Sequence, residues 1–232
     1  MRRDDPEASE LANKAALPAA AARVIAALTP LLSDQRLRRI EASVERRTRS
    51  VVVVLEAVQD PRNVAAVLRS ADAFGVQEVH LIEGTQPFLA SRRITQGAER
   101  WLDVVRHQSA EGCVGSLRRR GFRVYVATMD GQVGPGNLYS ADKIAVVFGN
   151  EQTGVGAQIA ALSDGRYTIP MQGFVQSLNV SVAAAITLYA ATRDRGGDLS
   201  EDDRADLRAR FMMLSVERAE QVVAEHLQRH SP

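Results

Sequence analysis

The chain has almost none of the residues that form the disulfide or metal cross-links of small proteins. Only one of its 232 residues is a cysteine, Cys113, so an intrachain disulfide is excluded. No group of cysteines and histidines has the spacing of a zinc site, and we expect no metal. A lone cysteine is typical of a protein that works in a reducing compartment. These absences exclude the disulfide-rich and zinc-stapled classes of protein.

Long hydrophobic runs are also missing. The longest apolar stretches are far shorter than the ~20 residues that a membrane-spanning helix requires. The first ten residues, MRRDDPEASE, are charged and lack the apolar segment of a secretory signal. The formal net charge is only +1, which by itself indicates neither a nucleic acid nor a membrane as partner. We therefore expect a cytoplasmic protein that does not bind membranes.

The composition suits an ordinary globular fold. Hydrophobic residues make up 45% of the chain and charged residues 25%, which is enough apolar material for one substantial core. An Ala-rich start with three prolines and a charged end flank the most hydrophobic part of the sequence. We expect four parts, in this order: a leader at 1–32, a basic helix at 33–49, a core at 50–193 and a helical extension at 194–232.

Strands and helices alternate within this core. The run VVVVLEAV, which begins at Val51, is β-branched and predicts a buried strand, and the helical pattern that follows closes at Gly75. Four more runs predict strands: EVHLIE, FRVYVAT, KIAVVFG and RYTIP. Such alternation is typical of an α/β fold, with a mostly parallel sheet that carries helices on both faces.

Polar clusters follow three of the predicted strands, where the carboxyl ends of parallel strands share one rim. They are Gln59 to Asn63 with Arg69 farther along, the GNEQTG run that begins at Gly149, and Ser177-Leu178-Asn179. Ser177 and Asn179 precede a small-residue run, so they can accept from the free N–H groups of a helix start, which also attracts anions. Each cluster alone is compatible with a plain turn or cap. Three on one rim favour an active site.

Familiar nucleotide motifs are absent, while arginine is concentrated near the start. Neither the G-x-G-x-x-G fingerprint after the first strand nor a G-x-x-x-x-G-K-[ST] loop is present. Residues 36–49 hold six arginines against two glutamates, and Arg36, Arg39 and Arg47 fall near one helical face. A second cluster includes Arg92 and Arg93. Arginine suits bidentate contact with phosphate, so a phosphate-bearing partner is indicated.

Three motifs in order, N-x-x-A-x-x-R, G-N-E and I-P-M-x-G-x-x-x-S-L-N-V-S-x-A-A-A, closely resemble the SpoU branch of the SPOUT superfamily. This branch methylates ribose 2′-hydroxyls of RNA with S-adenosylmethionine. The resemblance covers about residues 33–215. It implies a deep trefoil knot in the carboxyl-terminal part of the core, an exception to the rule against threaded connections. It also implies a homodimer formed through the knot region, with each site drawing on both chains, and no metal.

Within the branch, the chain is most similar to members that methylate guanosine 18 of tRNA. Arg36, Arg39 and Arg47 match their basic helix, and Arg193 and Arg195 match two more of their tRNA-binding arginines. Arg62 and the pair Gln152-Thr153 depart from the usual pattern beside the RNA. The departures concern the choice of nucleotide more than the reaction.

The resemblance also implies roles for single residues. Arg69 matches the catalytic arginine, and Asn63 and Glu151 match the residues that support it. A guanidinium stays protonated, so two roles for Arg69 are open: proton acceptor, or a cation that orients the ribose and stabilises an alkoxide. Ser177 and Asn179 match the third motif, which contacts phosphate and the methyl donor. The expected contacts of S-adenosylmethionine are Thr128, Gly149, Ile169, Met171 and Leu178.

Other functions fit parts of this pattern. The same core motifs serve enzymes that methylate ribosomal RNA or the wobble ribose of tRNA. A non-catalytic RNA-binding knot protein is a second alternative, although the intact motif residues argue against it. A small-molecule enzyme with a flavodoxin-like sheet is a third, and it leaves the flanking arginines without a role.

Overall fold

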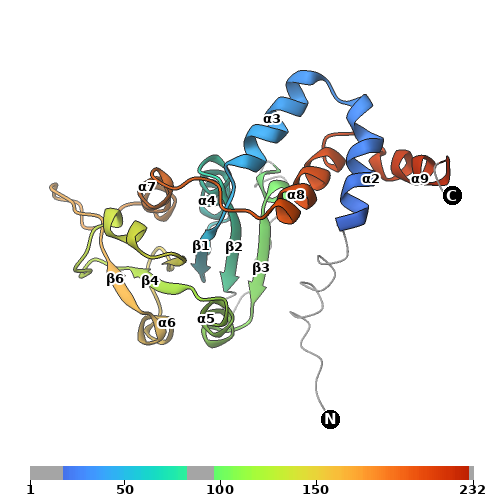
Figure 1. The fold of residues 1–232 in the computed structure, drawn as a ribbon. Helices are drawn as coiled ribbons and strands as arrows, with labels where there is room; N and C mark the ends of the chain where they lie inside the picture. The colour runs from blue at the N-terminus through green and yellow to red at the C-terminus, as the bar shows by residue number, and fades with distance from the viewer. Residues whose placement is uncertain (1–17, 83–96, 230–232) are drawn as a thin grey trace, which may run out of the picture. The chain divides into compact units, whose positions relative to one another are not determined.

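The computed structural model describes residues 18–82 and 97–229 (Figure 1). Most of the predicted leader, and Arg92 and Arg93 of the second arginine cluster, lie outside the described residues. The chain divides into two compact units, one at 47–198 and one formed by the residues before 47 and after 198. Within the described ranges, no helix has the length and hydropathy needed to cross a bilayer.

The core unit is built on a six-stranded sheet in which every neighbouring pair of strands is parallel. The strand order is β3-β2-β1-β5-β4-β6. The bounds are β1 Thr48–Glu56, β2 Val76–Ile82, β3 Asp103–His107, β4 Arg123–Ala127, β5 Ile144–Phe148 and β6 Gly165–Tyr167. The predicted parallel α/β sheet is confirmed.

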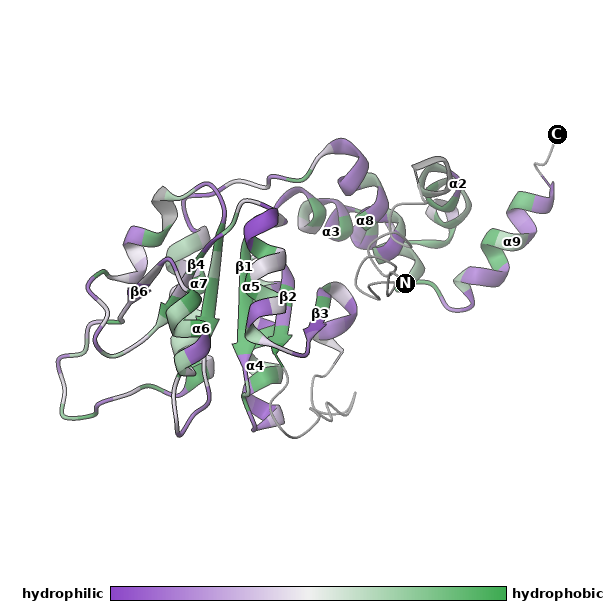
Figure 2. Cartoon of the chain, turned by 90° about the horizontal axis from the view of Figure 1, so that it is seen from below, coloured by the Kyte–Doolittle hydropathy of each residue, from purple (hydrophilic) through white to green (hydrophobic). Residues whose placement is uncertain are grey.

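Helices cover both faces of this sheet, as the sequence predicts. Alternate residues of a strand point to opposite faces, so Val51 and Val53 join one apolar cluster while Val52 and Val54 join the other. Helices α4 (Pro61–Ala73) and α7 (Val180–Thr192) cover the first face, together with the 3₁₀ turn η3 (Pro135–Ser140). Helices α5 (Ala110–Arg119) and α6 (Ala157–Leu162) cover the second. Figure 2 shows the buried strands between them as hydrophobic ribbon.

Strand β3 is absent from the sequence prediction. Its five residues, DVVRH, include only two apolar side chains, so no hydrophobic run predicts a strand there. The 3₁₀ turn η2 (Ala98–Trp101) leads into it, and the strand pairs in register with β2 at the edge of the sheet. Polar contacts hold it there, including a bond of 3.0 Å from Arg49 Nη2 to Asp103 Oδ2. Tertiary pairing, rather than local pattern, makes this segment a strand.

The core unit extends a few residues beyond the predicted bounds of 50–193 at each end. The Asp198 carboxylate accepts hydrogen bonds from the backbone N–H groups of Arg49 (2.7 Å) and Ser50 (3.1 Å). It also accepts from the Thr48 hydroxyl at 2.5 Å. These bonds tie the end of the unit to the start of β1. The basic helix is shorter than predicted for the same reason, because β1 already begins at Thr48.

The second unit is helical. It contains α2 (Pro18–Leu28), the 3₁₀ turn η1 (Thr29–Leu31), α3 (Asp34–Glu45), α8 (Glu201–Met213) and α9 (Ala219–Arg229). Helix α2 packs against α8 and α9, and α3 packs against α8, where Arg208 Nε donates to Glu41 Oε2 at 2.7 Å. Pro18 begins α2, where its missing N–H costs nothing. The described end of the leader is thus an ordinary packed helix.

A chain of buried polar side chains runs through the α5 face of the sheet. Arg120 Nη2 donates to Glu78 Oε2 at 2.7 Å, and the other Glu78 oxygen lies 2.6 Å from His80 Nε2. His80 Nδ1 lies 2.7 Å from His107 Nε2. Burial alone raises the pKa of Glu78, but its bonds to Arg120 and His80 outweigh this and leave the pKa well below its ordinary value. Burial, helped by His80, lowers the pKa of His107 to about 4.

This network predicts a stability that falls with acid. The pKa of His107 in the folded chain lies below its value of about 6.5 in the unfolded chain. Between pH 6.5 and 4 the unfolded chain therefore binds more protons, and the free energy of unfolding falls as the pH is lowered. His107→Gln should flatten this slope and remove up to about 3 kcal/mol of pH dependence. Urea unfolding at pH 6.5 and at pH 4 measures this change in the free energy of unfolding. Equal slopes in wild type and His107→Gln would contradict the assignment.

Candidate functional site

The site lies at the carboxyl ends of the central strands. Strands β1 and β5 are neighbours, although the chain forms β2, β3 and β4 between them, so the strand order reverses at this pair. Ligands of parallel α/β sheets bind outside such a switch point. The loop after β1, the loop at 149–156 after β5 and the segment from β6 to α7 all begin on this rim. They carry the three polar clusters found in the sequence.

Hydrogen bonds join one residue from each of these clusters. Asn63 Nδ2 donates to Glu151 Oε1 at 2.7 Å, and Asn179 Nδ2 donates to Asn63 Oδ1 at 3.1 Å. The second Glu151 oxygen accepts from the Gln59 backbone N–H at 3.4 Å. Residues 88 and 116 positions apart in sequence therefore form one continuous chain of bonds. The fold brings Asn63, Glu151 and Asn179 together.

Asn179 takes part in both the helix and the site. It is the N-cap of α7, where its Oδ1 accepts from the Ser181 backbone N–H at 2.8 Å and from the Ser181 hydroxyl at 2.6 Å. Its Nδ2 is the group that reaches Asn63. The cap is therefore Asn179 rather than Ser177, which lies two residues before it and lines the cavities described next. One amide stabilises the helix start with one end and the site with the other.

Two cavities adjoin this chain of hydrogen bonds. The larger, of about 650 Å³, lies among the segments that follow β4, β5 and β6, and its size is typical of small-molecule sites. A smaller one of about 300 Å³ reaches Glu151 and Asn179. All five residues predicted to contact a methyl donor line one or both: Thr128, Gly149, Ile169, Met171 and Leu178. Ser177 and Leu178 line both cavities, so the two form a single candidate site.

The loop that carries Glu151 is held in a tight turn. Asn150 and Gly154 exchange two backbone hydrogen bonds, of 3.0 and 2.9 Å. A side chain on Gly149 would collide with the Gly154 backbone, so only glycine allows this approach. Gly154 itself has a φ of +70°, which also favours glycine. The glycines of GNEQTG therefore shape the wall of the cavity that bears Glu151.

Arg69 lies on the same helix as Asn63. It is exposed on α4, six residues beyond Asn63, which is about 9 Å along a helix axis. It is not among the described residues that line either cavity.

The arginines predicted to bind RNA have different environments. Arg36 and Arg39 lie one turn apart on α3, and Arg39 is exposed. Arg193 is exposed and pairs with Asp194 at 2.9 Å. Arg195 is half-buried and donates to the backbone carbonyls of residues 141 and 142. Arg39 and Arg193 thus keep the accessibility that phosphate contact requires, and Arg36 is partly exposed.

Arg47 requires a correction. The sequence places it on the basic helix, but α3 ends at Glu45 and Arg47 is only 2% exposed. Its guanidinium bonds to the Asp72 carboxylate and to the Val76 carbonyl at 3.4 Å. To reach an RNA phosphate, Arg47 would have to leave its buried position and give up both of these bonds. Arg47 holds α4 to the start of β2 and is not available for RNA.

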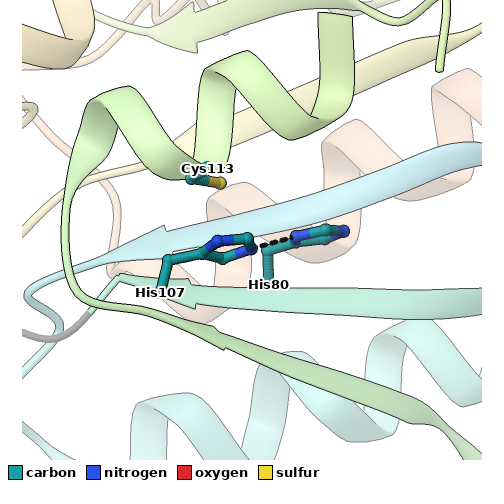
Figure 3. A group of neighbouring side chains, drawn as sticks. All are labelled: His80, His107 and Cys113. Carbon is teal, nitrogen blue, oxygen red and sulfur yellow. Dashed lines mark hydrogen bonds between the residues drawn. The ribbon is translucent and has the colours of Figure 1, made fainter. Parts of the chain in front are cut away.

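His80, His107 and Cys113 form the one described cluster with metal-ligand chemistry. Figure 3 shows the two imidazoles joined edge to edge, with Cys113 of α5 projecting toward them. Zinc binds imidazole nitrogens at about 2.0–2.1 Å, which separates two such nitrogens by roughly 3.3 Å in a tetrahedral site. The 2.7 Å between His80 Nδ1 and His107 Nε2 is instead a direct hydrogen bond. We assign the cluster to the core.

Comparisons with known proteins show the family to which the chain belongs. A model described as the SpoU rRNA Methylase family matches residues 50–189, which is more than half of the chain. The chain belongs to the SpoU family. A curated relative from Thermus thermophilus, named tRNA (guanosine(18)-2′-O)-methyltransferase, is 38% identical over 164 residues, which cover 70% of this chain and 84% of the relative.

Solved structures show the same relationship. The crystal structure of the TrmH/SpoU tRNA modifying enzyme of A. aeolicus matches with a TM-score of 0.70 and 27% identity, and covers 80% of this chain and 98% of that one. An AdoMet-bound rRNA methyltransferase from Sinorhizobium meliloti matches with a TM-score of 0.58 and 28% identity over 69% of this chain and 61% of that one. The SpoU chain therefore shares its fold with RNA methyltransferases that use S-adenosylmethionine as methyl donor.

The two ends of Asn179 can be separated by substitution. Asn179→Asp keeps an oxygen for the helix cap but loses the donor to Asn63, whereas Asn179→Ala loses both. We expect the alanine variant to lose about 1 kcal/mol of unfolding free energy and the aspartate variant to lose much less. Urea unfolding measures the difference. Both variants should lose methyl-transfer activity; an aspartate variant as active as wild type would show that the bond to Asn63 has no part in the reaction.

Proposed function

We propose that this SpoU chain transfers the methyl group of S-adenosylmethionine to the ribose 2′-hydroxyl of guanosine 18 in tRNA. The observation that carries the proposal is the hydrogen-bonded chain of Glu151, Asn63 and Asn179 at the rim of a cavity of small-molecule size. The similarity to tRNA guanosine-18 methyltransferases over most of the chain supports the choice of substrate. The lone cysteine suits action in the cytoplasm, where tRNA is found.

The cavity residues would hold the methyl donor. Ile169, Met171 and Leu178 offer apolar surface to its less polar parts, while backbone groups of the same loops offer hydrogen bonds. When bound, the sulfonium of S-adenosylmethionine supplies an activated methyl group. The protein therefore has mainly to align the ribose oxygen behind that methyl group and to manage one proton.

We propose Arg69 as the residue that deals with the proton of the ribose 2′-hydroxyl or with the negative charge left on the oxygen. Its guanidinium is either the proton acceptor or the cation that stabilises the developing alkoxide. Because Arg69 does not line the cavities of its own chain, we propose that it acts in the site of a second copy. Glu151 and Asn63 would then support the site into which the partner's arginine reaches.

Helix α7 offers the surface for that second copy. One side of α7 packs into the core, and yet the opposite side is apolar as well, with Val182 45%, Ile186 39% and Tyr189 56% exposed. A helix that is apolar all round is normally covered on both sides. We propose a homodimer that buries this side of α7, in the region where the family resemblance also implies the knot.

The tRNA would be bound by arginines outside the cavity. Arg36 and Arg39 on α3 and Arg193 after α7 are the proposed phosphate contacts. Arginine forms paired bonds with phosphate oxygens, and each contact releases counterions. Binding should therefore weaken steeply as salt is raised, which a small-molecule enzyme with the same fold would not show.

Labelled methyl transfer to unmodified tRNA transcripts tests the proposed function. We expect incorporation of one methyl group, mapped to the ribose of guanosine 18, and none when that nucleotide carries a 2′-deoxyribose. The deoxy transcript is the matched control because it lacks only the accepting oxygen. Methylation at the wobble ribose, or only of ribosomal RNA, would overturn the substrate while leaving the reaction class; no transfer to any RNA would favour a binding protein.

Subunit mixing tests the shared site. Arg69→Ala and Glu151→Ala should each be inactive alone, because every site then lacks one partner. In an equal mixture, half of the dimers contain both variants and have one intact site each, so roughly a quarter of the wild-type methyl transfer should return. As control, Glu151→Ala mixed with the double variant should recover nothing. A mixture no more active than its components would place Arg69 and Glu151 in the same chain's site.

A further inference from the structure

We propose that Glu56 is a positioning residue for methyl transfer, because its carboxylate fastens the loop that carries Glu151. This inference rests on the proposed function and extends it to a residue outside the three motifs. Glu56 is the last residue of β1, and its Oε2 accepts from the Gly156 backbone N–H at 2.7 Å. Gly156 ends the loop that begins at Gly149. Glu56 therefore holds the far end of the loop on which Glu151 lies.

Gly156 is shaped for this contact. A Cβ atom added there would lie 2.8 Å from Glu56 Oε1, so the carboxylate at the end of that side chain would have to move aside. The φ of Gly156 is −62°, so its backbone conformation alone does not require glycine. A side chain at this position would instead displace the carboxylate. The two residues are matched to each other.

The residue after Glu56 shows that the junction is held under strain. Ala57 has a φ of +50°, in the left-handed region that residues with a side chain rarely adopt. Its N–H donates to the Ile82 carbonyl at 3.1 Å, and its carbonyl accepts from Asn150 Nδ2 at 2.9 Å. Strained backbone of this kind concentrates at functional sites. Asn150, which directly precedes Glu151, is thus anchored to the same turn.

Glu151 is therefore positioned from both sides. Asn150 is bound to Ala57 on one side, Gly156 is bound to Glu56 on the other, and the Gln59 N–H reaches Glu151 itself. Burial raises the pKa of the Glu56 carboxyl, and the bond from Gly156 only partly opposes this. On balance its surroundings disfavour the charged form, and perturbed groups of this kind cluster at functional sites. Without Glu56, the loop would be held at one end only.

Four variants test this role. Glu56→Ala should lower kcat about 10- to 100-fold, because a shift of about 1 Å in a site can cost that much. Glu56→Gln keeps an acceptor oxygen and should stay within about threefold of wild type. Gly156→Ala should resemble Glu56→Ala, and the double variant should be no worse than either, because both remove one contact. Gly136→Ala, where an added Cβ meets nothing within 4 Å, is the matched control.

Two further measurements separate positioning from a general loss of structure. The Kd for S-adenosylmethionine and the unfolding midpoint of Glu56→Ala should stay close to wild type while kcat falls. Amide exchange at 149–156, measured without substrates, should become faster in this variant. An unchanged kcat, effects that multiply in the double variant, or a loss confined to donor affinity would each overturn the proposal. If the wild type transfers no methyl group, the proposed function fails, and unchanged exchange in Glu56→Ala would then overturn the role of Glu56 separately.

Discussion

The parallel pairing of β1 with β5 is the constraint on which the rest of the site depends. Val51 to Leu55 pair in unbroken register with Ile144 to Phe148, so the two strands end side by side. A shift by one residue would move each side chain to the opposite face of the sheet and into a different set of neighbours, so close packing on both faces favours this register. The same register sets Glu56 and Asn63 beside the loop at 149–156. Core packing thus determines where Glu151 meets Asn63.

The sequence predicts those parts of the structure in which local pattern and tertiary environment agree. Strand β5 is an uninterrupted run of apolar residues and β1 contains one at 51–55, while Gly75, with a φ of +76°, ends α4 as expected. The motif residues lie where parallel strands must end, so their gathering on one rim could be anticipated. Strand β3 could not, because its polar residues become a strand only through pairing with β2. A local sequence pattern predicts the conformation that a segment prefers by itself, whereas β3 is a strand because it pairs with β2.

Charged and polar side chains are harder to place from sequence because their partners are distant along the chain. Arg47 follows directly after a basic helix and is nevertheless buried, since Asp72 lies 25 residues away and next to it in space. His80 and His107 belong to different strands that pair only in the folded sheet. Glu56 carries no motif signal at all, and its contact with Gly156 spans 100 residues. Each of these placements depends on register and therefore on the complete fold.

The same dependence explains why an asparagine, rather than another helix-capping residue, is needed at 179. Serine, threonine and aspartate also cap helices, because each offers an oxygen to the free N–H groups of the first turn. None of them has an N–H group to direct at Asn63 while that oxygen is occupied. Glutamine has both groups but is one methylene longer, which displaces its oxygen from the cap. Asparagine at 179 makes both bonds, so the helix start and the site are served by the two ends of one amide.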